Sequence, residues 1–196
     1  MDQSDWIYPK FYGAVVEVQA LPEFGIPVLS AEGTAQAPDS VPYDEVLSTL
    51  RGKGELREEF MQFATDYQKE AICFAAPRLG TMLKHPTGSG KTFTAIVWSL
   101  LAPGPIIVVT RAPTRNQYAR QYIRFTHLRP FVCESKYRKK DQWKSLAEYL
   151  NWCEDQNQRP VVVVGWDSLA DWIERFESCF WYTVIFDESQ KGKSGK

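Results

Sequence analysis

The 196-residue sequence has few cysteines and no long apolar run. Its cysteines are widely spaced and form no C-x-x-C pair, which argues against a zinc site or a disulfide framework; they are Cys73, Cys133, Cys153 and Cys179. No apolar stretch approaches the roughly 18 residues of a membrane span, and no charged start precedes an apolar signal segment. We therefore expect a soluble, intracellular protein with buried free thiols and no membrane partner.

Acidic residues are absent from the middle of the chain. Residues 71–133 contain no Asp or Glu and eight Lys or Arg, whereas residues 1–70 carry 13 acidic and five basic residues, and residues 134–196 carry 11 and 10. The net charge of −1 therefore conceals a basic central third, which would create a positive field and attract polyanions. Alternatively, these basic side chains pair with acids from the flanking thirds in the folded chain.

The basic third contains a glycine loop in the sequence TMLKHPTGSGKT, residues 81–92. Gly88 and Gly90 lack a Cβ, so their backbone N–H groups can turn toward a phosphate while a helix begins at Lys91. Lys91 would reach the β and γ phosphates of a triphosphate, and the Thr92 hydroxyl would help to hold Mg²⁺. Gly-Lys-Thr alone recurs by chance, but here an apolar strand precedes it and an apolar helix follows. The loop therefore predicts a nucleotide site.

Gln68 has two possible roles. With Thr65 it fits a capping box at the start of a helix, and its amide also matches the donor and acceptor pattern of an adenine edge. Spacing alone does not separate capping from adenine binding. The predicted nucleotide-binding residues are Gln68, Thr87, Gly88, Ser89, Gly90, Lys91 and Thr92.

Strands and helices alternate after the loop. Apolar runs predict strands, whereas spacings of three and four residues predict the helices between them; the strands are 105–110, 130–133, 160–165 and 182–186, and the helices lie within 111–125, within 139–153 and after Ser168, with Ser168 and Asp171 as its cap. This order predicts an α/β fold with a parallel sheet and flanking helices. We expect residues 61–196 to form that domain and residues 1–60 to form a small β and helical lead-in.

Asp187 and Glu188 follow the last predicted strand, and ligands of such sheets gather at the carboxyl ends of strands. A nucleotide hydrolase needs such a pair, Asp187 to hold Mg²⁺ and Glu188 to polarise the attacking water. An ordinary polar exit from the sheet is the alternative. Lys91 and Glu188 are thus the candidate catalytic residues, and Thr92 and Asp187 the candidate metal ligands.

Four segments together carry a family resemblance. HPTGSGKT, the Gln68 segment, VVTRAPTRNQYARQYIRF and VIFDESQ resemble motifs I, Q, Ia and II of superfamily 2 helicases, and are most similar to Swi/Snf-type DNA translocases, including compact bacteriophage versions. The resemblance implies a RecA-like ATP-binding lobe in the cytoplasm of a bacterial or phage-infected cell, with ATP and Mg²⁺ as cofactors. It implies movement on DNA through backbone contacts from Arg111, Thr114, Arg115, Gly165 and Trp166.

The chain departs from this family in two respects. His85 and Gln190 replace residues typical of motifs I and II, and the sequence stops soon after motif II. A strand that this family places between the phosphate-loop strand and the Asp-Glu strand is missing, so we expect a gap with two exposed edges. We also expect a partner polypeptide that carries the remaining motifs and the second lobe, without which the chain hydrolyses ATP poorly. Alternatives are a restriction-type or other superfamily 2 motor acting on DNA or RNA, and a non-catalytic DNA- or partner-binding module that regulates a complete helicase.

Overall fold

Apolar strands buried on both faces form the centre of the computed structural model, which describes residues 15–16, 40–78, 80–81, 88–133, 145–177 and 179–187. The strands are β1 Val15–Val16, β2 Gly80–Thr81, β3 Ile106–Thr110, β4 Phe131–Val132, β5 Val161–Gly165 and β6 Thr183–Phe186. The α-helices are α1 Tyr43–Lys53, α2 Asp66–Ala75, α3 Lys91–Leu101, α4 Arg115–Phe125, α5 Leu146–Asp155 and α6 Leu169–Phe176. Two 3-10 turns lie at Glu58–Phe60 and Ala112–Thr114.

The strands form one six-stranded sheet in the order β2-β1-β6-β3-β5-β4, and every pairing is parallel. Strand β3 lies inside the sheet, paired with β5 along Ile106–Thr110 and with β6 along Ile106–Val109. The predicted α/β fold with a parallel sheet and flanking helices is confirmed, and it is consistent with part of a RecA-like lobe.

Alternate residues of β3 face different layers of helices. Ile106 and Val108 belong to a core cluster with residues of α1, α3 and α4, whereas Ile107 and Val109 belong to a cluster with residues of α5 and α6. A strand covered on both faces needs apolar side chains at every position, which is why this strand and β5 read as continuous apolar runs. Residues of α1 and α3 share one core, so positions on both sides of residue 60 contribute to it.

Strand β1 corrects the expected gap in the sheet. Val15 and Val16 pair with Gly80 and Thr81 of β2 on one side, and with Val184 and Ile185 of β6 on the other. The prediction of two exposed central edges was wrong, because a short segment of the N-terminal region supplies the backbone donors and acceptors that those edges require. Within residues 1–39 of the predicted lead-in, Val15 and Val16 are the residues that the structure describes.

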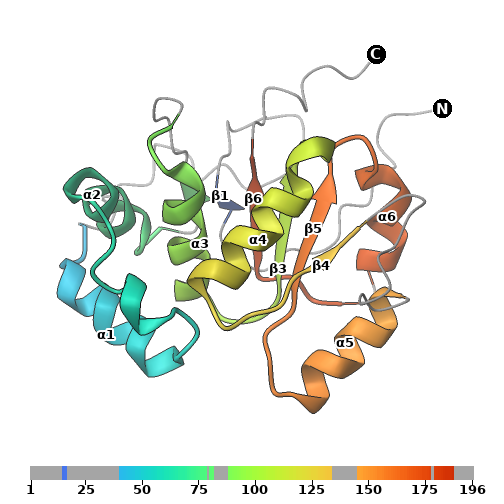
Figure 1. The fold of residues 1–196 in the computed structure, drawn as a ribbon, viewed down its shortest axis with the longest axis horizontal. Coiled ribbons are helices and arrows are strands. Elements are labelled where there is room, and N and C mark those ends of the chain that lie inside the picture. The colour runs from blue at the N-terminus through green and yellow to red at the C-terminus, as the bar shows by residue number, and fades with distance from the viewer. Residues whose placement is uncertain are drawn as a thin grey trace, which may run out of the picture.

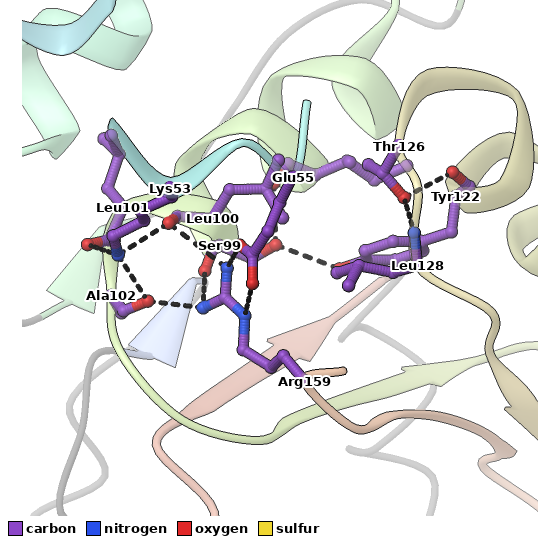
Figure 2. A network of polar contacts seen from close by, with 11 residues as sticks. Lys53, Glu55, Ser99, Leu100, Leu101, Ala102, Tyr122, Thr126, Leu128 and Arg159 are labelled. Atoms are coloured by element: carbon purple, nitrogen blue, oxygen red, sulfur yellow. Dashed lines mark hydrogen bonds and ion pairs between the residues drawn. The ribbon is translucent and has the colours of Figure 1, made fainter. Parts of the chain in front are cut away.

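Two cations hold the C-terminal end of α3, the helix that begins at the phosphate loop (Figure 2). Lys53 Nζ, at the end of α1, donates to three carbonyl oxygens there at 2.6–2.9 Å, those of Leu100, Leu101 and Ala102. Arg159, just before β5, donates to the carbonyl oxygens of Ser99, Leu100 and Ala102. The last carbonyl oxygens of a helix have no partner within the helix, so these cations satisfy them. Cations there also interact favourably with the negative end of the helix dipole.

The carboxylate of Glu55 completes this arrangement. Arg159 Nε lies 3.0 Å from Glu55 Oε1, and a second contact joins Arg159 Nη2 to Oε2, so the pair is bidentate. The side chains of Arg159 and Glu55 are only 7% and 20% exposed. Burial, followed by the charge of Arg159, lowers the pKa of Lys53, whereas Glu55 acts in the opposite direction. The network ties α1, α3 and β5 together at the edge opposite the candidate site.

We expect Glu55→Ala to lower the free energy of unfolding by about 1–3 kcal/mol, because it leaves the buried Arg159 cation without its carboxylate. Urea unfolding followed by circular dichroism measures the change. Glu58→Ala is the matched control, since the Arg51–Glu58 pair is 52% and 75% exposed and should contribute less than about 0.5 kcal/mol. Equal losses in the two variants would contradict a stabilising role for the buried pair.

Candidate functional site

The candidate site lies at the carboxyl edge of the parallel sheet. Asp187 directly follows β6, Trp166 directly follows β5, and Arg111 directly follows β3. In Figure 1, the arrows of β5 and β6 point toward the edge from which the chain enters α3 at Lys91. The parallel order therefore brings the glycine loop, the Asp187 carboxylate and the basic loop after β3 to one edge, where ligands of such sheets gather.

The described end of the glycine loop has the backbone that a phosphate cradle needs. Gly88 and Gly90 have φ values of 83° and 78°, a region that residues with a Cβ rarely adopt. Gly90 is the N-cap of α3 and its carbonyl oxygen accepts from Phe93 N at 3.0 Å. Ser89 Oγ is buried and has no hydrogen-bond partner among the described residues. A buried hydroxyl beside the N-terminus of a helix fits an anionic ligand.

Gln68 connects the start of α2 to this loop. Its Oε1 accepts from Thr65 N at 2.9 Å, so the predicted capping box is confirmed. Its Nε2 donates to the carbonyl oxygens of Ser89 and Gly90 at 3.2 and 3.4 Å. Gln68 is buried, with 5% of its surface exposed, and its amide holds two carbonyl groups of the loop. A role of this amide in binding adenine stays a prediction.

Asp187 is held by two neighbouring strands. Its backbone N donates to Val109 O at 2.8 Å, and its Oδ2 accepts from Thr110 Oγ1 at 2.8 Å. From the end of β5, Trp166 Nε1 donates to Asp187 O at 2.9 Å, and the indole stacks on Phe186 with ring centroids 5.4 Å apart. Asp187 thus has a fixed backbone and one oriented carboxylate oxygen, the arrangement expected of a metal ligand.

Tyr118 of α4 is buried and lies near Asp187. Burial raises the pKa of the Tyr118 hydroxyl well above its ordinary value, and the nearby Tyr122 and Asp187 raise it further. Tyr118 therefore stays neutral and adds no negative charge near the carboxylate.

The loop after β3 is basic, and its side chains differ in their surroundings. Arg111 is exposed, whereas Arg115 is partly buried and donates to Cys133 O at 2.5 Å, Ala112 O at 3.2 Å and Ser168 Oγ at 3.5 Å. Thr114 Oγ1 lies 2.9 Å from Thr110 Oγ1 and 2.9 Å from Arg111 O. The Arg115 guanidinium therefore links the segments that follow β4 and β5. Sequence analysis did not predict this structural role.

Gly165 allows a close approach at the end of β5. A Cβ there would overlap Asp167 Oδ1 and crowd Ser168 Oγ. Ser168 precedes α6 as predicted, but its hydroxyl does not cap that helix; it contacts Gly165 O and accepts from Arg115. The expected cap was wrong because these tertiary partners engage the hydroxyl instead.

The structure brings most of the predicted site residues to one edge. Gln68, Gly88, Ser89, Gly90, Lys91 and Thr92 surround the start of α3, and Asp187, Arg111, Thr114, Arg115, Gly165 and Trp166 follow the neighbouring strands. Thr87, Glu188, His85 and Gln190 lie outside the described residues. Sequence analysis missed Thr110, although a hydroxyl at the end of the apolar run IIVVT was a visible signal.

Comparison with known proteins identifies the class. A family model described as the type III restriction enzyme, res subunit, matches residues 57–195, well over half of the chain. It represents a helicase-type, ATP-binding N-terminal domain, which supports the expected superfamily 2 helicase lobe; the Swi/Snf-type subtype stays a prediction. The chain belongs to this family, and a search of curated proteins found no match.

Neither a membrane-spanning helix nor a cluster of metal ligands occurs among the described residues. None of their helices is long and apolar enough to cross a membrane. Within the same ranges, no group of three or more His, Cys, Asp or Glu side chains is placed to hold a metal ion.

We expect Gly90→Ala to destabilise the protein more than Gly88→Ala. Both glycines have positive φ, which costs a residue with a Cβ about 1–2 kcal/mol. A Cβ at Gly90 would also overlap the Gln68 amide, whereas no atom of the described residues lies within 4 Å of a Cβ at Gly88. Displacing that buried amide from its two carbonyl partners should add about 1 kcal/mol. Thermal unfolding measures both variants.

A Gln68→Ala background supplies the control. Because that substitution removes the overlapping amide, Gly90→Ala should then cost no more than Gly88→Ala. An unchanged excess cost in this background would show that the Gln68 contact is irrelevant to Gly90.

Proposed function

We propose that this domain binds Mg-ATP at the loop ending in Lys91 and Thr92, hydrolyses it, and uses it to act on DNA. The family supplies the helicase-type ATP-binding class. The single observation that carries the finer proposal is the common edge of the sheet: the start of α3, the oriented Asp187 carboxylate and the basic loop after β3 all lie there.

The residues present fit a magnesium-bound nucleotide. Gly88 and Gly90 have the backbone of a phosphate cradle, Ser89 Oγ is a buried hydroxyl with no partner among the described residues, and α3 presents its N-terminus. Lys91 would bind the β and γ phosphates, and Thr92 and Asp187 would hold Mg²⁺. When bound, Mg²⁺ neutralises charge on the transferring phosphoryl group. Glu188 would accept a proton from the attacking water.

The partner we propose is the DNA backbone. Residues 71–133 contain eight basic residues and no acidic one, and the Arg111, Arg120 and Arg124 side chains are exposed in the structure. Arg111, Thr114 and the residues at the C-terminal end of β5, Gly165 and Trp166, would contact phosphates. Such contacts provide affinity without sequence specificity. Arg115 would act mainly by holding Cys133 and Ser168 in place.

Two kinds of DNA motor fit this proposal. A Swi/Snf-like translocase was expected from the motifs, whereas the family match favours the restriction-type alternative. Both would use the same nucleotide site of this domain, so the experiments below apply to either.

We expect Lys91→Ala to weaken Mg-ATP binding roughly 10- to 150-fold, the effect of losing a charge-assisted contact of about 1.5–3 kcal/mol. Titration calorimetry with a non-hydrolysable ATP analogue measures the dissociation constant. Lys69→Ala is the control, because this lysine pairs with Asp66 on α2 and should bind as the unaltered chain does. If both variants bind equally, the loop is not the nucleotide site; if Lys91→Ala alone fails but DNA binding persists, the two sites are separate.

We expect Arg111→Ala to weaken binding of unrelated DNA duplexes to a similar degree. Losing one phosphate contact should reduce the slope of log K against log salt by about 1. Fluorescence anisotropy over a series of NaCl concentrations measures this slope. Arg129→Ala, a substitution of another exposed arginine from the same basic third, is the matched control. A change confined to one duplex sequence would indicate base readout and contradict the proposal.

A further inference from the structure

Three side chains form a continuous polar path from the basic loop to the candidate metal ligand. Thr114 Oγ1 lies 2.9 Å from Thr110 Oγ1, and Thr110 Oγ1 lies 2.8 Å from Asp187 Oδ2. Thr110 has no exposed surface. The middle of the path is therefore closed to water, whereas Thr114 and Asp187 at its two ends are half-buried.

The number of protons fixes the direction of these hydrogen bonds. A carboxylate only accepts, and each threonine hydroxyl donates one proton. Thr110 therefore donates to Asp187 Oδ2, and the contact between the two hydroxyls can form only if Thr114 donates to Thr110. Thr114 has a competing acceptor, the carbonyl oxygen of Arg111 at 2.9 Å. One proton thus serves two acceptors, so the Thr114 hydroxyl has two alternative arrangements.

A third acceptor would change this balance. A phosphate oxygen bound at the loop carries charge and accepts a stronger hydrogen bond than a neutral carbonyl or hydroxyl oxygen. It would take the Thr114 proton, and Thr110 would lose its incoming donor. Because successive hydrogen bonds polarise one another, the bond from Thr110 to Asp187 would weaken. The Asp187 carboxylate would then keep more of its negative charge for a cation.

We propose that Thr110 is a positioning residue that couples the two sites: through the Thr114–Thr110–Asp187 hydroxyl path, phosphate binding at the loop after β3 tightens binding of the magnesium nucleotide. This inference rests on the proposed function, since it takes the phosphate from DNA and the cation from Mg-ATP. By linkage, the nucleotide must tighten DNA binding by the same factor.

Trp166 gives this path a fixed end. Its backbone N donates to Thr110 O at 2.9 Å, and its indole Nε1 donates to Asp187 O at 2.9 Å. The main chains at both ends of the Thr110–Asp187 contact are therefore joined to one residue. A change in the hydroxyl protons would act on the carboxylate charge, because the backbone is not free to move away.

The test measures coupling between two ligands on the full chain. The dissociation constant of a fluorescent, non-hydrolysable ATP analogue with Mg²⁺ is measured with and without a saturating DNA duplex, and that of the duplex with and without the nucleotide. In the unaltered chain we expect each ligand to tighten the other about 5-fold, at the low end of usual coupling. Thr110→Val, which keeps the shape and removes the hydroxyl, should reduce this factor to about 1.

Two further variants separate the path from a general structural effect. Thr110→Ser keeps the hydroxyl and should retain the coupling, whereas Thr114→Val should abolish it at saturating DNA even where DNA binding is weaker. Thermal unfolding checks each variant, and Thr114→Val provides the test if Thr110→Val does not fold.

The outcomes distinguish this inference from the proposed function. If the unaltered chain binds neither ligand, the proposed function is overturned, together with the inference. If it binds both but they do not couple, or weaken each other, only the hydroxyl path is overturned. Coupling that survives in Thr110→Val, or that is lost equally in Thr110→Ser, would also overturn it.

Discussion

The parallel pairing of β3 with β5 and β6 is the constraint on which the site depends. These strands run in one direction and in register, so the residues that follow them, Arg111, Trp166 and Asp187, reach the same edge of the sheet. The apolar side chains of β3 alternate between two helix layers, so both faces of the strand are buried away from water. Burial of apolar surface therefore positions polar groups that contribute nothing to that burial.

Both ends of α3 are held from outside the helix. Gln68 supports the loop carbonyls at its start, and Lys53 and Arg159 satisfy the carbonyls at its end. A helix whose N-terminus binds phosphate gains from cations at its C-terminus, because they offset the opposite end of its dipole. The network of Figure 2 lies at the C-terminal end of α3, away from the site, yet it holds in place the helix whose N-terminal end forms part of the site.

Local pattern was a good guide to elements and a poor guide to their partners. Every strand predicted after the loop is present. A short run of β-branched apolar residues, such as VVVV before Gly165, is typical of a strand that is buried on both faces. The capping box of Thr65 and Gln68 also formed as predicted, since both partners are close in sequence. The cap predicted at Ser168 did not form. Its hydroxyl instead accepts a hydrogen bond from Arg115, which is distant in sequence, and donates to the carbonyl oxygen of Gly165, which precedes the helix.

The sequence by itself determined the α/β order of elements, the glycine loop, the basic central third and the family, since each depends on residue type and local spacing. Only the tertiary structure decided which strand lies between β2 and β6, because β1 has two residues and its place depends on pairing with segments far along the chain. It also decided that Thr110 meets Asp187 across 77 positions. Local spacing carries no information about such contacts, which form only when the strands align.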